Sequence, residues 1–200
     1  MKNNLIKIPF FALALLGVAA GEGIASPVTL TDWNSTAFFD SYVHPRNPDV
    51  TINGYWRDWT VDGTDNLFQS RISVRGFGSL VTMDVDSSEV SDTNSSGYND
   101  TFSIQRSSDW LQVDSRFSLL GGTDGSGRST INWMTDFINT SGEEQTLTLF
   151  HMVDFDLGSA ADDEYGQMLN NNLARQWDDL TMVSMAMAQE VDHYYCGTPM

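Results

Sequence analysis

The chain has 200 residues, with 10 Lys and Arg against 27 Asp and Glu, a net charge of -17 and a single cysteine. A surface this acidic repels a phosphate backbone, so we expect no nucleic-acid partner, and one cysteine excludes an internal disulfide framework and a cysteine-rich zinc site. The hydrophobic and aromatic content argues against disorder, and the length suits one domain with a sizeable core.

Residues 1–25 have the layout of a secretory signal peptide. Lys2 and Lys7 give a positively charged start, an apolar run follows, and cleavage fits after Ala20 or after Ala25, which we favour. The run is too short for a comfortable membrane span, although an uncleaved anchor helix is the alternative. We therefore expect Sec-type export, a secreted or cell-surface location, and a mature chain without a membrane span.

The mature chain, residues 26–200, is more acidic than the whole. Both lysines lie in the leader, so eight Arg remain against 26 acidic residues, a net charge of -18. Such a surface stays hydrated and resists association in salt. A saline habitat and the ordinary solubility of a secreted protein explain it equally well.

From about residue 50 onward, short strand patterns alternate with turn clusters. Residues 67–80 alternate with period two, which predicts a strand with one buried and one solvated face. Further strands are expected at 49–56, 59–61, 80–85, 101–106, 110–119, 130–139 and 145–157, with a turn at 61–66 and a polar loop at 87–100. Regular short strands with turns between them predict an all-β fold, a single antiparallel β-sandwich domain.

Residues 165–195 permit two interpretations. Their many good helix formers would suit one amphipathic helix. They would equally suit two strands on either side of Asp178 and Asp179, because a β-rich context overrides helix propensity. We favour the strands.

Three parts of the chain carry a resemblance to known proteins. They are the leader and the segments WTVDGTDNLFQSRISVRGFG at 59–78 and STINWMTDFINTSGEEQTLTLFHMVDFDL at 129–157. Together they resemble exported bacterial β-sandwich proteins of the PEP-CTERM kind. The resemblance implies sorting to the cell surface or extracellular matrix by an exosortase, and most such proteins have no assigned activity. The sorting tail of that family does not follow here, because the sequence ends in YYCGTPM. Either this member is simply secreted or the chain is truncated, and a lone Cys196 fits truncation.

The acidic segment 151–164 is the sharpest candidate for a metal site. Asp154 and Asp156 would share one strand face, about 7 Å apart, and Asp162 and Asp163 follow across a short loop. Clustered carboxylates suit Ca²⁺, although the spacing is not that of an EF-hand. The alternative, a solvated strand face and acidic loop, is the one we favour. Weaker candidates are the acidic turns Asp62/Asp65/Asn66 and Asp84/Asp86/Glu89.

Histidines and nucleophiles give no catalytic motif. Alternation places His151 on the strand face opposite Asp154, so we expect a sheet-buried or edge histidine. His44 and His193 belong to no zinc motif, and no serine or cysteine nucleophile pattern is present.

The segment GYWRDW at 54–59 is the candidate for ligand stacking. Strict alternation would place Tyr55, Arg57 and Trp59 on one strand face and Trp56 on the other. Exposed Tyr and Trp rings can stack on sugars. The alternative, which we favour, is core packing.

These patterns predict an exported, non-enzymatic protein of the cell surface or extracellular matrix, without an assigned activity, for which Ca²⁺ or a glycan is the expected ligand. The alternative is a hydrolase or lyase that acts on extracellular polysaccharide through acidic residues, and which needs two or three carboxylates converging in a cleft. A third interpretation is a fragment of a longer anchored protein.

Overall fold

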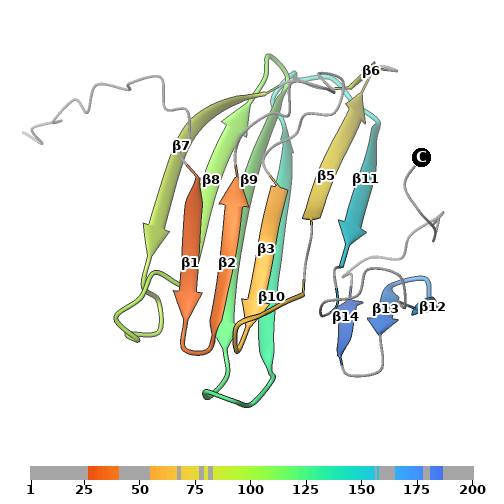
Figure 1. Cartoon of the computed structure of the whole chain (residues 1–200). Helices are drawn as coiled ribbons and strands as arrows, with labels where there is room; N and C mark the ends of the chain where they lie inside the picture. Colours follow the sequence, from red (N-terminus) through yellow and green to blue (C-terminus); the bar gives the residue numbers. More distant parts are fainter. Residues whose placement is uncertain are drawn as a thin grey trace, which may run out of the picture.

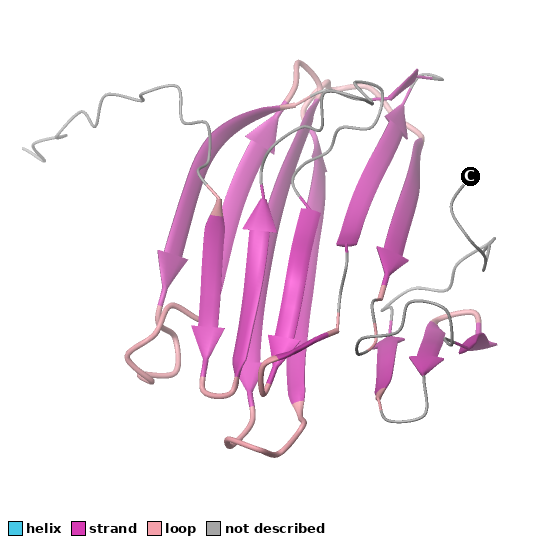
Figure 2. Cartoon of the chain, viewed as in Figure 1, coloured by secondary structure: helices cyan, strands magenta, loops and turns pink. Residues whose placement is uncertain are grey.

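The computed structural model describes residues 27–40, 55–66, 69–76, 79–80, 83–155, 157, 165–177 and 181–186. Throughout this described part the regular elements are β-strands, and they pair in three antiparallel sheets (Figures 1 and 2). None of it forms a helix long and apolar enough to cross a membrane. The predicted all-β fold is confirmed.

The first sheet has seven strands and draws on distant parts of the chain. Its main path runs β1 (Val28–Asp32), β2 (Ser35–Asp40), β3 (Tyr55–Val61), β5 (Gln69–Gly76) and β11 (Leu147–Asp154), while β4 (Thr64–Asp65) pairs with β3 and β6 (Ser79–Leu80) pairs with β5. The strand β11 follows the whole second sheet in sequence, so the chain crosses back to complete the first sheet.

The second sheet is a four-stranded meander that packs against the first. It contains β7 (Asp84–Ser91), β8 (Thr101–Ser107), β9 (Leu111–Gly121) and β10 (Ser129–Asn139) in the spatial order β10-β9-β8-β7. Figure 1 shows the two sheets facing each other as the layers of a sandwich.

A third, smaller sheet forms near the end of the chain. It contains β12 (Tyr165–Asn170), β13 (Leu173–Trp177) and β14 (Met182–Ala186), which pair in chain order. A hydrogen bond from Gln176 Nε2 to the carbonyl of Phe155, 2.9 Å long, ties it to the segment after β11. Where the structure describes residues 165–195 they are therefore strands, as favoured from the sequence.

Aromatic rings fill the space between the two large sheets. Phe39 and Trp56 come from the first sheet, and Phe102 and Phe117 come from the second. The Phe39 and Phe102 ring centroids are 4.7 Å apart, and those of Trp56 and Phe117 are 5.1 Å apart in an edge-to-face arrangement. Such pairs stabilise the core beyond their buried area. The indole of Trp133 on β10 extends the cluster, 5.0 Å from Phe117.

Three strands lie where the sequence pattern did not place them. The hairpin β1–β2 precedes residue 50, and its buried positions include Asp32, which breaks the apolar alternation that would have marked a strand. The strand β7 occupies part of the predicted loop at 87–100, so only the segment from Asp92 to Asp100 is a loop. Because β7 is an edge strand with mostly exposed side chains, a polar sequence is tolerated there.

A bulge in β3 overturns the alternation predicted for the aromatic segment. The register joins Phe38 to Arg57 and Ala37 to Trp59, which leaves Asp58 without a partner position and with a positive φ of 55°. Trp56 and Trp59 consequently pack against the same core cluster. The prediction that they lie on opposite strand faces is wrong for this reason.

The aromatic core makes a testable contribution to stability. Phe117 is 2% exposed at the centre of the cluster, whereas Leu120 on the same strand is 48% exposed. We expect Phe117→Ala to lower the free energy of unfolding by about 3–5 kcal/mol, because it leaves a cavity among packed rings. Leu120→Ala is the matched control and should change it by less than about 0.5 kcal/mol. Urea denaturation followed by fluorescence measures both, and equal losses would contradict this account of the core.

Candidate functional site

The predicted calcium ligands lie at the margin of the described residues. Asp154 is the last residue of β11, whereas Asp156, Asp162 and Asp163 lie outside the described part. Among the residues that the structure does describe, no three His, Cys, Asp or Glu side chains are grouped so as to hold a metal ion. The calcium site at these four residues stays a prediction.

The candidate stacking residues Trp56 and Trp59 do not form an exposed aromatic surface. Trp56 is 2% exposed and packs on Phe39 and Phe117, so its ring cannot contact a sugar. Trp59 is partly buried, and its Nε1 donates a hydrogen bond of 3.3 Å to Ser129 Oγ in the second sheet. Tyr55 begins β3, and its side chain is outside the description. The core-packing alternative therefore applies to Trp56.

His151 is an edge-strand histidine, one of the two predicted alternatives. It lies on β11, the last strand of the first sheet, where its Nε2 is 2.9 Å from Ser70 Oγ and its ring meets Trp133 edge-on at 5.1 Å. Although part of its surface is exposed, desolvation by these neighbours lowers the pKa of the imidazole from 6.5 to about 4. The ring is neutral at physiological pH, and the contacts around it are structural.

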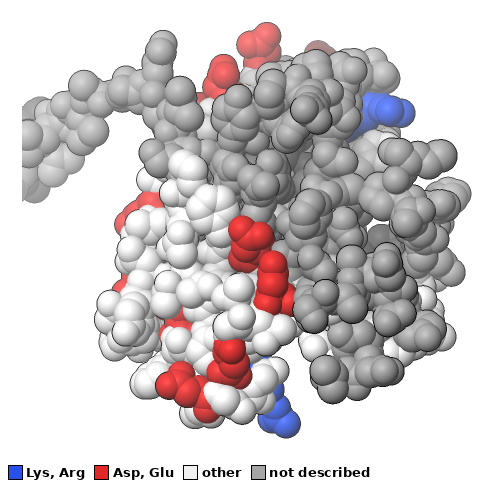
Figure 3. All heavy atoms as spheres, viewed as in Figure 1, with Lys and Arg blue, Asp and Glu red and all other residues white. Residues whose placement is uncertain are grey.

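Carboxylates also have structural roles at one end of the sandwich, which we call the loop-bearing end. It comprises the turns at 33–34 and 62–63 and the loops 92–100 and 122–128, which Figure 1 shows at the same end of the strands. Acidic side chains are prominent on this end of the space-filling view (Figure 3). The hydrogen bonds show that several of them bind neighbouring loops.

Asp62 fastens the glycine-rich loop 122–128. Its carboxylate accepts hydrogen bonds from the backbone N–H groups of Gly125 (2.6 Å) and Gly127 (2.7 Å) and from the Asn34 amide (3.1 Å). The two backbone hydrogen bonds, more than any other contact, lower the pKa of this carboxyl. Asn66 does not join it, because its amide donates to the carbonyl of Thr64 at 2.7 Å. Within the turn at 62–66, Asp62 therefore acts as a hydrogen-bond acceptor for the loop 122–128.

Asp32 and Asn34 hold the β1–β2 hairpin on both sides of its turn. The buried Asp32 carboxylate accepts from the Gly121 N–H (2.8 Å) and the Asn94 amide (3.0 Å), and Asn34 Oδ1 accepts from the Gly122 N–H (2.7 Å). The turn is therefore bound to the loop before β8 and to the loop before β10 at once.

Asp100 closes the loop 92–100 upon itself. Its carboxylate accepts from the backbone N–H and hydroxyl of Thr93 and from the N–H of Asn94. Desolvation opposes ionisation of this group, but these hydrogen bonds together with one from Thr101 outweigh it and lower the pKa. The turns and loops of the loop-bearing end are thus joined to one another and closed upon themselves by hydrogen bonds.

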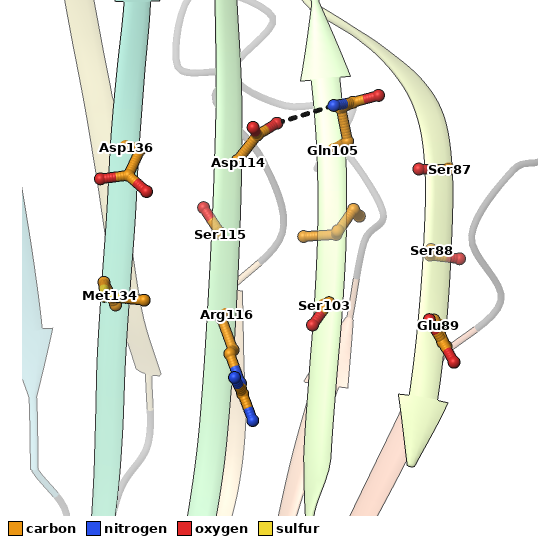
Figure 4. Close-up of a pocket in the computed structure, with 11 residues that line it drawn as sticks. Ser87, Ser88, Glu89, Ser103, Gln105, Asp114, Ser115, Arg116, Met134 and Asp136 are labelled. Atoms are coloured by element: carbon orange, nitrogen blue, oxygen red, sulfur yellow. Dashed lines mark hydrogen bonds between the residues drawn. The ribbon is translucent and has the colours of Figure 1, made fainter.

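An open groove crosses the outer face of the second sheet, over β7, β8, β9 and β10. Its volume is about 360 Å³, and its outward side chains form two rows that follow the strand register (Figure 4). One row is Glu89, Ser103, Arg116 and Met134, and the other is Ser87, Gln105, Asp114 and Asp136.

The groove presents hydrogen-bond donors and acceptors on side chains of paired strands. Asp114 accepts from Gln105 Nε2 at 3.0 Å and from Gln112 Nε2 at 3.0 and 3.1 Å, which fixes its carboxylate. Asp136 lies directly opposite Asp114 on β10, and Arg116 forms no ion pair with a described residue. Sequence reasoning missed this site, because only the strand register brings these three residues together.

No family model matches the chain, and comparisons with curated proteins and with solved structures found no match. The function is therefore argued from the surfaces of the molecule.

The hydrogen bonds of Asp62 predict how fast the amide hydrogens of the loop 122–128 exchange with solvent. We expect Asp62→Ala to speed hydrogen exchange at the Gly125 and Gly127 amides severalfold, because both lose their acceptor. Asp124→Ala changes an exposed carboxylate in the same loop and is the matched control. Exchange measured by NMR distinguishes them, and unchanged protection in the Asp62 variant would show that the loop holds itself.

The neutral His151 predicts how stability depends on pH. The unfolded chain takes up a proton at this residue below about pH 6.5, whereas the folded chain does so only near a pKa of about 4. His151 therefore favours folding at neutral pH, and its contribution falls as pH decreases from 6.5 to 4. We expect melting temperatures of His151→Gln to vary less across this window than those of the wild type. The same slope in both proteins would rule out this role.

Below about pH 4, protonation of two carboxylates lowers the stability of the folded chain further. The folded-state pKa values of Asp62 and Asp100 are lowered from 3.8, so the stability they provide is present above that value and is lost as pH falls further.

Proposed function

We propose that the chain is an exported, non-enzymatic protein of the cell surface or extracellular matrix, and that it binds a glycan on the outer face of β7–β10. The observation that carries the proposal is the groove, in which Gln105, Asp114, Arg116 and Asp136 present amide, carboxylate and guanidinium groups across adjacent strands. Such groups pair with the hydroxyls of a sugar, each as donor or acceptor.

The shape of the groove favours a polymer over a small metabolite. Small molecules bind in concave pockets that bury most of their surface, whereas this groove is open along a sheet face and most of its lining residues are polar. Met134, exposed beside Arg116, adds one apolar contact for the carbon face of a sugar ring. An extended chain of sugars could follow the two rows of side chains.

One observation favours the alternative of a polysaccharide hydrolase. Residues directly opposite on antiparallel strands have Cβ atoms about 4.5–5.5 Å apart, so Asp114 and Asp136 hold two carboxylates close together on one face. Retaining glycosidases use a pair about 5–5.5 Å apart. In that alternative Asp114, which the amides of Gln105 and Gln112 hold in position, would be the nucleophile, and Asp136, without a hydrogen bond to a described residue, would be the acid. Open exposure to water argues against this, because catalysis gains from excluding water.

Affinity electrophoresis through gels that contain xylan, mannan or hydroxyethyl cellulose tests the proposal. We expect at least one polysaccharide to retard the wild type, and Arg116→Ala and Asp136→Asn to weaken retardation at least about tenfold, the effect of losing one charged hydrogen bond. Arg128→Ala, which changes an exposed Arg outside the groove, is the control. Release of reducing ends that depends on both Asp114 and Asp136 would support the hydrolase, and retardation that is unchanged in the groove variants would overturn the groove.

A further inference from the structure

The tip of the β1–β2 hairpin carries a tryptophan in a backbone conformation that favours glycine. Asp32 pairs with Ser35, so Trp33 and Asn34 form a two-residue turn. Trp33 has a φ of 46° and is 66% exposed, while Asn34 is not among the residues with positive φ. A positive φ at only the first central residue is the feature of a turn that normally has glycine there.

This choice of residue costs folding energy and recovers none by burial. A side chain in the left-handed region is strained, and the strain is least for Asp, Asn and small polar residues. The other non-glycine residues with positive φ in the described part are Asp58, Asp62 and Ser95. Trp33 is the bulky one among them, and its ring faces solvent. Strain kept where it brings no internal contact points to a contact outside the molecule.

The neighbours of Trp33 hold it in place. Asp32 binds the Gly121 N–H and the Asn94 amide, and Asn34 binds the Gly122 N–H and the Asp62 carboxylate. The residues on both sides of Trp33 are thus hydrogen-bonded to separate loops. An exposed aromatic ring on so constrained a backbone loses little entropy when it binds a ligand.

The loops next to the β1–β2 turn carry polar, acidic and aromatic side chains. Tyr98, a second exposed aromatic residue, belongs to the loop 92–100, and the neighbouring Asn99 carbonyl accepts a 2.9 Å hydrogen bond from the Thr31 N–H in β1. The carboxylates of Asp32 and Asp62 are already engaged in the internal hydrogen bonds described above. The exposed ring of Trp33 remains for a ligand, and the net acidity of the adjoining loops suits a neutral ligand better than an anionic one.

We propose that Trp33 is the stacking residue of a second glycan site at the loop-bearing end, which takes the apolar face of a neutral sugar ring. Aromatic faces with nearby polar groups suit such rings. An acidic surface does not suit an anionic membrane, and a protein hot spot requires a central patch shielded from water, which a hairpin tip among polar loops does not provide.

This site is independent of the groove. Gly121, which binds Asp32, lies five residues beyond Arg116 on β9, about 16 Å along the strand at its usual rise. Two glycan contacts at this separation would let one molecule engage a polysaccharide at two points or join two chains.

The test uses cellohexaose, xylohexaose and mannohexaose with the full chain. We expect at least one hexasaccharide to shift the indole N–H signal of Trp33 in NMR spectra, assigned as the signal that Trp33→Gly lacks. Trp33→Ala and Trp33→Gly should bind it at least tenfold more weakly. Trp33→Gly should also raise the melting temperature by about 2–4 °C, because it removes the strain at this position.

Two controls separate the strain from the contact. Ser95→Gly relieves a φ of 63° in the neighbouring loop and should raise the melting temperature while binding stays unchanged. Phe150→Ala removes an exposed ring on β11, away from this end, and should leave binding unchanged. Arg116→Ala should keep the Trp33 shift, so loss of the groove and loss of this site give different results. Unchanged binding in Trp33→Ala, or no shift of the Trp33 signal with any hexasaccharide, would overturn the proposal.

Discussion

The packing of aromatic rings between two antiparallel sheets is the constraint on which the other features of this molecule depend. Phe39, Trp56, Phe102 and Phe117 fill the interior so closely that centroid distances between the sheets are about 5 Å. Two of the rings come from each sheet, so the cluster fixes both the separation of the sheets and the direction in which the remaining side chains point. The outer faces and the turns are thereby left for polar residues.

The acidity of the chain has two separate physical meanings. Part of it is a solvated surface, as in the exposed Asp84, Asp86 and Glu89 of β7. Another part serves contacts within the molecule. The carboxylates of Asp32 and Asp62 accept hydrogen bonds from the backbone N–H groups of Gly121, Gly125 and Gly127. Charge-assisted hydrogen bonds from N–H groups to a carboxylate are stronger than those to a neutral acceptor. Net charge counts both kinds alike, so it could not indicate which carboxylates are available to a ligand.

The strands that could be predicted were those whose burial follows period two. In β9, positions from Leu111 to Leu119 alternate between buried and less buried sides, and the sequence shows the same alternation. The hairpin β1–β2 escaped prediction because the buried Asp32 interrupts its apolar pattern, and β7 because an edge strand needs few apolar residues. The bulge at Asp58 also defeated the prediction of strand faces in β3. One bulged residue reverses the face of the side chains that follow it, and the local sequence does not reveal the bulge.

The candidate sites were predictable to a smaller extent than the fold, because their members meet only through register and loop contacts. Asp114 and Asp136 are distant in sequence and lie side by side only because β9 and β10 pair. Nothing in the sequence around Trp33 indicates its positive φ. The two surfaces differ in what holds them. The groove side chains stand on hydrogen-bonded strands and need no strain, whereas Trp33 occupies a strained turn that neighbouring carboxylate and amide groups secure. If both bind glycan, the internal carboxylates contribute indirectly, because they keep the turn from relaxing and so preserve the position of the exposed ring.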